Sequence, residues 1–368
     1  EDEEADALQQ TTTMLDLSFD PQAEATHVYS WIHGGTLDPK SKQDIKQLKM
    51  RLSSLLTSRS EGFRQQLVDS YREQYGKSME KDIKAVIQKG HALEIICGLL
   101  VPVAEYDARL IAEYVQNWDI EPIADIICCR SLKQLKDLHA AYRKLNKLNV
   151  RKQLQALAQK DKKRTLVKVI GSIFDLDRTE AKDVDMQKVN EDLSFAMTTK
   201  SFKGDTKERL ILIFTANSTE YIKVFAQQFK IKQGNDDLPT FIDKKLGPKS
   251  TAGHFCKTRI LYAVDTPDYF AKTISKLGTN YKKNQKKISD IFIQRMEVDL
   301  WDIHRAWAMG KYGGNKDLKQ WIASKTGGSK AGYLLQKMLE NCERYAQFQK
   351  KLDNKDPTAK RNKALDMM

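Results

Sequence analysis

A pattern of residues that returns four times constrains the fold of this 368-residue chain more than any other feature. It is centred on four anchor positions, spaced 71, 87 and 78 residues apart: Arg59, Arg130, Asn217 and Arg295. An aliphatic residue stands four positions before each anchor, at Leu55, Ile126, Ile213 and Ile291. An aromatic residue stands twelve positions after each, at Tyr71, Tyr142, Phe229 and Trp307. Self-similarity of this kind indicates structural repeats whose apolar faces pack on one another.

Helical periodicity dominates within each repeat. Segments such as 64–75 and 219–230 place apolar residues at i, i+3, i+4 and i+7, and no sustained alternation indicates a sheet. A repeat of about 70 to 85 residues accommodates about five short helices. The sequence therefore predicts an all-α fold of four repeats with about five helices each, in which the anchor lies in a turn between two packed helices.

The polar segment 175–187 interrupts the spacing and is interpreted as a linker between two halves. The predicted repeats on either side of it cover 25–102, 103–174, 188–265 and 266–345. The remaining segments, 1–24 and 346–368, are interpreted as an acidic, polar tail and a basic tail.

The net charge of +13 predicts attraction to anionic surfaces such as phospholipid, nucleic acid or acidic protein tails, and charge alone does not choose among them. Five cysteines without a CxxC pair predict buried thiols in a reducing compartment. The longest apolar run, 95–104, is far shorter than the roughly 20 residues of a membrane span. No HExxH, GxSxG or Walker motif occurs, so neither catalysis nor an organic cofactor is expected.

Several motifs resemble the annexin family. The segment 55–87 contains the family's SR turn, YG pair and D-L/I-K helix, and the fourth repeat matches through TPDYFAKTISKLGT and YGGNKDLKQWI. The resemblance covers about residues 25–345. It implies a curved disc of four helical repeats. The degraded loops described next are similar to those of the calcium-poor protist annexins, the alpha-giardins.

Annexin calcium sites resemble GxGT in one loop and add a distant Asp or Glu, because calcium prefers hard oxygen ligands. The four carboxylate positions hold Val86, Leu157, Lys245 and Lys325 here, so calcium is expected only at atypical or weak sites. Their candidate ligands lie in three loops: Gly35, Thr36, Asp38, Gly204, Asp205, Gly278 and Thr279. The plainer interpretation makes Asp38 and Asp205 turn or helix-capping residues.

Lysines occupy positions that face the membrane in the family. An insertion around NYKKNQK in the fourth repeat is predicted to be a loop, and it concentrates four lysines. The predicted membrane contacts are Lys245, Lys282, Lys283, Lys286, Lys287, Lys325 and Trp118. The alternative is an ordinary solvated lysine face.

The resemblance implies a cytoplasmic protein that is peripheral at the inner face of a membrane and binds acidic phospholipid. A cytoskeletal protein that binds the acidic tails of microtubules remains the alternative, with the same electrostatics. A nucleic-acid partner is not expected, because no aromatic and basic platform is present. Asp107 and Arg130 resemble a charged pair near the central axis of the disc and are interpreted as a buried ion pair that fixes repeat packing.

Overall fold

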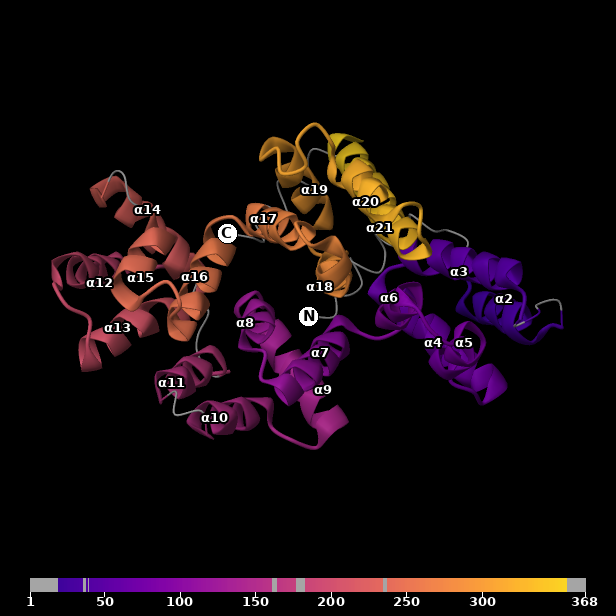
Figure 1. The fold of residues 1–368 in the computed structure, drawn as a ribbon, viewed down its shortest axis with the longest axis horizontal. Coiled ribbons are helices and arrows are strands. Elements are labelled where there is room, and N and C mark those ends of the chain that lie inside the picture. Colours follow the sequence, from indigo (N-terminus) through magenta and orange to yellow (C-terminus); the bar gives the residue numbers. More distant parts are fainter. Residues whose placement is uncertain are drawn as a thin grey trace. The chain divides into compact units, whose positions relative to one another are not determined.

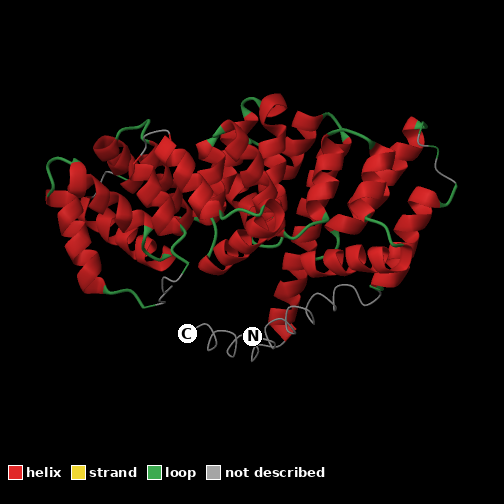
Figure 2. Ribbon diagram, turned by 90° about the horizontal axis from the view of Figure 1, so that it is seen from below, coloured by secondary structure: helices red, strands yellow, loops and turns green. Residues whose placement is uncertain are grey.

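The computed structural model describes residues 19–35, 38, 40–160, 164–176, 183–233 and 237–355, with side chains as far as residue 347. These residues form twenty helices and no strand (Figure 2). The all-α prediction is therefore confirmed. Thr36, most of the acidic segment 1–24, part of the linker and the end of the basic tail lie outside the described residues.

The chain divides into two compact units, and each is described by itself. Unit 1 combines residues 1–103 and 270–368, which contain the first and fourth predicted repeats. Its helices from the first repeat are α2 (Pro21–His33), α3 (Lys42–Thr57), α4 (Glu61–Tyr75), α5 (Met79–Ile87) and α6 (His91–Leu99). Those from the fourth are α17 (Thr266–Gly278), which begins in unit 2, α18 (Tyr281–Arg295), α19 (Leu300–Met309), α20 (Leu318–Thr326) and α21 (Lys330–Lys355) (Figure 1).

Unit 2 covers residues 104–269 and contains the second and third predicted repeats. The helices of the second are α7 (Val103–Asn117), α8 (Ile120–Cys128), α9 (Leu132–Asn146), α10 (Val150–Lys160) and α11 (Arg164–Ile173). Those of the third are α12 (Met186–Thr198), α13 (Gly204–Thr215), α14 (Thr219–Gln233), α15 (Leu238–Leu246) and α16 (Thr251–Val264). Four successive sets of five helices follow the predicted repeat pattern.

Local sequence explains where the third helix of a repeat begins and ends. The hydroxyls of Ser60 and Ser131 cap α4 and α9 by accepting hydrogen bonds from backbone N–H groups in the first turn. Gly76 ends α4 in the left-handed conformation, with φ of 62°, which glycine adopts without steric cost. Lys147 ends α9 in the same conformation, with φ of 57°. The third helices of the first two repeats thus begin and end at equivalent places.

The repeated apolar positions form the core of each unit. The aliphatic residues four before the anchors are at most 8% exposed, and the aromatic residues twelve after them are at most 1% exposed. One continuous cluster of buried residues runs through unit 2 from Ala108 to Ala263. The core positions predicted from the repeat are therefore confirmed. Burial of such side chains contributes about 1.5 to 3 kcal/mol each, so the repeated positions add to the stability of every repeat.

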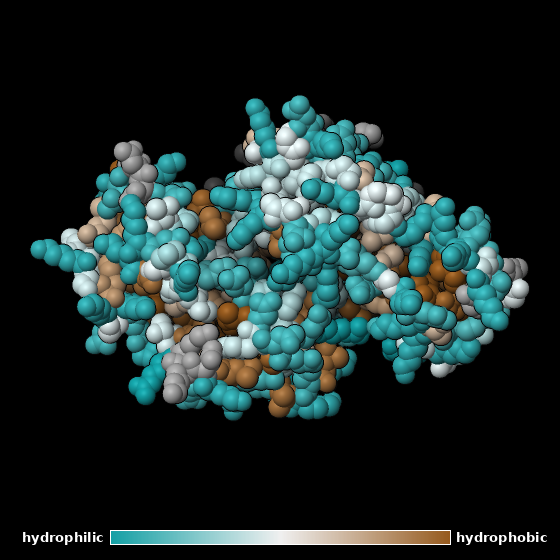
Figure 3. Space-filling model, viewed as in Figure 1, coloured by the Kyte–Doolittle hydropathy of each residue, from teal (hydrophilic) through white to brown (hydrophobic). Residues whose placement is uncertain are grey.

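Two helices extend beyond the expected borders. Helix α2 begins at Pro21, inside the expected tail 1–24, and α21 continues through Lys355, past the expected end of the fourth repeat at 345. Asp20 caps α2 and accepts hydrogen bonds from Gln22 and Ala23. Within the described parts of the chain, no helix is both long and apolar enough to span a membrane. Hydrophilic side chains cover most of the face shown in Figure 3, with apolar side chains between them.

Candidate membrane-docking loops

Each repeat has a docking loop, defined here as the connection between its first and second helices. The predicted carboxylate position lies near the end of the fourth helix of the same repeat. In the third repeat these are the segment 199–203, between α12 and α13, and Lys245 on α15. The geometry at each loop determines which ligand it suits.

Lys245 reaches the docking loop of the third repeat. Its Nζ lies 5.5 Å from the ring centroid of Phe202 in the loop and 5.4 Å from that of Phe241 on its own helix. Phe202 is buried, so the two rings hold the ammonium against the loop by cation–π attraction. Gly204 and Asp205 follow the loop as the exposed first residues of α13. An ammonium therefore lies beside the loop at the predicted carboxylate position.

The fourth repeat has a similar arrangement. Gly278 is buried as the last residue of α17, and a Cβ there would come within 2.2 Å of the Trp321 ring on α20. The Nζ of Lys325 lies 5.6 Å from the Trp321 ring centroid. Thr279 is exposed, and its hydroxyl donates to the carbonyl of Lys276. Trp321 thus connects the loop to Lys325, and glycine is required at position 278 because the indole packs directly on it.

The predicted loop around NYKKNQK is wrong. Lys282, Lys283, Lys286 and Lys287 lie in the first two turns of α18, which begins at Tyr281. Lysine and glutamine favour helices, and Ile288 and Ile291 bury the opposite side of this segment in unit 1. Lys282 and Lys283 are exposed, whereas Lys286 lies 3.4 Å from the carboxylate of Asp290. The insertion therefore presents lysines from a rigid helix.

The docking loop of the first repeat has different chemistry. Gly35 has φ of 73°, and Asp38 accepts a hydrogen bond from the backbone N–H of Lys40 while its own N–H donates to Asp44. Asp38 is therefore used in the turn before α3, as the plainer interpretation expected. The carboxylate position holds Val86, which offers no ligand oxygen.

Beside this loop, a hydrogen-bonded group joins α2, α4 and α5. The Nε2 of His33 lies 2.8 Å from Oδ2 of Asp82, and the Tyr71 hydroxyl donates to the same oxygen at 2.8 Å. Burial alone would raise the pKa of Asp82, but the hydrogen bonds from His33 and Tyr71 lower it below its ordinary value. Burial, followed by the contact with Asp82, raises the pKa of Tyr71. The carboxylate of Asp82 is thus already hydrogen-bonded within the protein.

The docking loop of the second repeat is the short turn at Trp118 and Asp119. Trp118 adopts φ of 49°, and its side chain is partly buried against the core cluster of unit 2. This packing favours a structural contribution from Trp118 over insertion into a membrane. Leu157, at the carboxylate position on α10, is half-buried and supplies no ligand oxygen.

The side chains at the four predicted carboxylate positions do not suit a calcium ion. Two of the four carboxylate positions hold apolar residues and two hold ammonium groups, which repel a divalent cation. Nowhere in the described residues do three histidine, cysteine, aspartate or glutamate side chains gather in a way that suits a metal ion. Asp205 is an isolated carboxylate at the start of α13, and the adjacent loop carbonyls of Ser201 and Lys203 accept hydrogen bonds from Thr206.

The predicted pair of Asp107 and Arg130 is present in unit 2. Nε and Nη2 of Arg130 donate to the two carboxylate oxygens of Asp107 at 2.6 and 2.9 Å, and both side chains are at most 3% exposed. Burial alone would lower the pKa of Arg130, but the charge of Asp107 and the two hydrogen bonds raise it. The pair connects α7 to the anchor turn before α9.

One group in unit 1 has the connectivity of a catalytic triad. Nδ1 of His91 lies 2.8 Å from a carboxylate oxygen of Glu94, and Nε2 lies 2.8 Å from the hydroxyl of Ser289. Ser289, however, is 1% exposed and its hydroxyl donates to the carbonyl of Gln285 within α18. A serine buried in a helix interior is not presented to a substrate. The group fastens α6 to α18.

Sequence reasoning missed the partners of the docking-loop residues. The contact between Lys245 and Phe202 and the bond between His33 and Asp82 join positions about 40 to 50 residues apart, which helical periodicity does not relate. One signal was available, because Asp82 stands eleven residues after Tyr71 and Gln153 stands eleven after Tyr142. The hydroxyl of Tyr71 donates to Asp82, and the hydroxyl of Tyr142 donates to Gln153.

Comparison with known proteins agrees with the observed fold. No protein-family model matches the chain. Annexin A6 of Mus musculus is 24% identical over 319 residues, which are 84% of this chain and 44% of annexin A6, so the chain spans less than half of that relative. The structure superposes on annexin III with a TM-score of 0.75 at 21% identity, covering 88% of this chain and 94% of that one. It superposes on calcium-bound alpha-14 giardin with a TM-score of 0.70 at 13% identity, covering 87% and 99%.

The fold is therefore the annexin fold. The sequence is similar to that of annexin A6 at 24% identity, and the fold is shared with annexin III and with alpha-14 giardin.

Proposed function

We propose that the chain is a non-enzymatic, annexin-like protein that docks peripherally on acidic phospholipid membranes through lysines instead of the usual calcium sites. The observation that carries this proposal is the position of Lys245, whose ammonium is held against the docking loop of the third repeat by Phe202 and Phe241. In the family's arrangement a carboxylate there binds calcium, and calcium binds lipid phosphate. A fixed ammonium contacts the phosphate without an intervening ion.

The magnitudes suit weak and reversible docking. A lysine close to an anionic bilayer contributes about 1 kcal/mol, and the attraction falls off within a Debye length of about 8 Å at physiological salt. The candidates besides Lys245 are Lys325 and the lysines of α18: Lys282, Lys283, Lys286 and Lys287. Such a surface depends on salt and on the charge of the lipid. Calcium contributes little, because the atypical candidates near Gly35, Asp205 and Gly278 lack a converging carboxylate set.

The direct test is reversal of charge at the docking lysines. A variant with Lys245→Glu, Lys282→Glu, Lys283→Glu and Lys325→Glu is expected to lose sedimentation with phosphatidylserine vesicles while its helical content and melting temperature stay close to those of the unmodified chain. A matched control reverses four exposed lysines elsewhere: Lys81, Lys133, Lys160 and Lys223.

Full vesicle binding by the docking variant would overturn the proposal. The acidic tails of microtubules, which carry negative charge without a bilayer, would then be the next partner to test.

A further inference from the structure

A shallow depression on the third helix of the second repeat is not part of the docking loops. It has a volume of about 640 Å³ and is lined by Lys136, His139, Ala140, Arg143, Lys144, Lys147 and Leu176. Four of the seven residues are lysine or arginine, and none is a carboxylate. The site lies entirely in unit 2.

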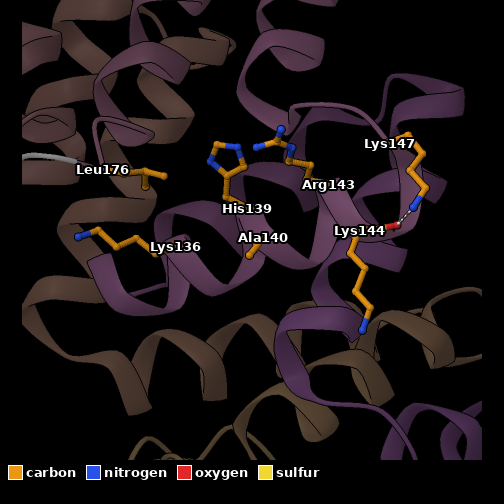
Figure 4. Close-up of a pocket in the computed structure, with 7 residues that line it drawn as sticks. All are labelled: Lys136, His139, Ala140, Arg143, Lys144, Lys147 and Leu176. Carbon is orange, nitrogen blue, oxygen red and sulfur yellow. Dashed lines mark hydrogen bonds between the residues drawn. The ribbon is translucent and has the colours of Figure 1, made fainter.

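The charges of this depression are not neutralised by ion pairs. Lys136, Arg143 and Lys147 have no carboxylate partner within the parts of the chain that the structure describes. The Nζ of Lys147 donates to the carbonyl of Lys144 at 3.1 Å, which keeps its charge at the end of α9. In Figure 4, His139 and Arg143 project from the same side of α9, with Leu176 beside His139.

The surroundings of His139 show that the electrostatic potential in the depression is positive. Its Nε2 lies 3.1 Å from the side-chain nitrogen of Asn149. Burial lowers the pKa of His139, and the positive charges of Arg143 and Arg151 lower it further. Cations in the last turn of a helix also stabilise its negative end, which accounts for Arg143 and Lys144 but not for Lys136, two turns earlier.

Apolar side chains flank the depression. Leu145 is 41% exposed and Leu148 is 50% exposed, on either side of the left-handed turn at Lys147. The third helices of the next two repeats end in a similar way. Near the end of α14, Ile231 is 74% exposed and stands between two lysines. At the end of α19, Met309 is 79% exposed and stands shortly before Lys311. Exposed apolar side chains among lysines suit the interface of an anionic bilayer. There the apolar side chains enter the boundary of the acyl region, and the lysines contact the lipid headgroups.

Topology separates this surface from the docking loop of its own repeat. Trp118 precedes α8, and α9 follows it. The depression lies along α9, whereas the docking loop joins α7 to α8, so the two surfaces are built from different segments of the repeat.

We propose that the α9 depression binds the phosphorylated headgroup of a phosphoinositide lipid, with Leu145 and Leu148 entering the bilayer beside it. Several phosphate groups on one headgroup match three or four cations that carboxylates do not neutralise. The exposed leucines favour a lipid over a soluble polyphosphate of the same chemistry. This inference concerns a second site and does not depend on the lysine docking loops.

The first experiment measures binding to phosphatidylcholine vesicles that contain phosphatidylinositol bisphosphate and no phosphatidylserine. A variant with Lys136→Gln, Arg143→Gln and Lys147→Asn is expected to bind about a hundredfold more weakly, from three lost surface charges. Asparagine at 147 tolerates the left-handed backbone. A control with Lys160→Gln, Lys223→Gln and Lys249→Gln has the same net charge and is expected to bind like the unmodified chain. Equal loss in both variants, or in neither, overturns the proposal.

The second experiment separates a lipid from a soluble anion. A Leu145→Ser and Leu148→Ser variant is expected to lose most of its vesicle binding and to keep its calorimetric affinity for inositol hexakisphosphate. If the unmodified chain binds inositol hexakisphosphate but not the vesicles, the lipid assignment is wrong. A Lys245→Glu and Lys325→Glu variant is expected to retain phosphoinositide binding, so failure of the docking-loop proposal leaves this result unchanged.

Discussion

The anchor turn of the second repeat and the docking loop of the third use positive charge in opposite ways. Arg130 is buried and both oxygens of Asp107 bind it, so its charge is neutralised inside the protein. Lys245 is only half-buried and lies on aromatic rings, so its charge remains available to a ligand. The first arrangement stabilises the fold, and the second supplies a contact surface. Changes at the two places should therefore have separable effects on stability and on binding.

The largest expected effect on stability is at the buried pair. Asp107→Asn removes one charge and leaves the Arg130 guanidinium buried without its counter-ion, which typically costs about 3 to 5 kcal/mol. Urea unfolding should show this loss. The control is Asp69→Asn, because Asp69 and its partner Arg72 are both more than 60% exposed and such pairs contribute at most about 1 kcal/mol. Equal losses in the two variants would contradict a structural function for the buried pair.

The next effect concerns close packing at a docking loop. In Gly278→Ala the new methyl group would come within 2.2 Å of the Trp321 ring, and overpacking of this kind costs about 1 to 3 kcal/mol. The melting temperature should fall, and the quenching of Trp321 fluorescence should change. Gly62→Ala is the control, because that glycine lies inside α4 with no atom closer than 4.0 Å to the added Cβ. It should leave the melting temperature unchanged or raise it.

A smaller effect is expected on binding at Lys245. Lys245→Gln removes one charge, so affinity for phosphatidylserine vesicles should fall about fivefold, which corresponds to about 1 kcal/mol. Stability should change by less than in Asp107→Asn, because only a cation–π contact is lost. Lys223→Gln, on the exposed surface of α14, is the matched control. A loss of stability with unchanged vesicle binding would mean that Lys245 serves the fold and not a ligand.

The smallest effect is the pH dependence of the group around Asp82. Its pKa is lower in the folded chain than in the unfolded chain, so the stabilisation is present above the ordinary aspartate value of about 3.9 and is lost as the pH falls through the folded value. The stability difference between the unmodified chain and Asp82→Asn should therefore be constant at neutral pH and shrink below about pH 4. A difference that grows toward acid would contradict the assignment.

The sequence alone was enough to predict the repeated core. Leu67, Leu138, Phe225 and Ile303 stand eight residues after the four anchors, and all are fully buried. Buried positions on amphipathic helices recur with a fixed period, so a fourfold pattern reveals them. The segment after Asn280 was misassigned as a loop because it was read as an insertion, although its lysines and glutamine favour a helix.

The candidate sites were less accessible to sequence reasoning. Lys245 could be assigned to a docking loop by its position in the repeat, and Phe241 stands one turn before it on the same helix, but the contact with Phe202 depends on how the loop packs on α15. The basic depression on α9 was missed because its lysines are typical of any helix end, and only the structure adds Leu176 and the exposed Leu145 and Leu148. Surface charge is visible in a sequence, whereas its neutralisation by partners is not.

The central claim is that lysines have taken over from calcium in binding acidic membranes. The most direct measurement is sedimentation of the unmodified chain with phosphatidylserine vesicles, with millimolar calcium or with chelator, across a salt series. The account predicts the same binding with calcium and with chelator, and a steep fall as salt rises. Binding that requires calcium and resists salt would contradict it and would make Asp38 and Asp205 the first positions to substitute.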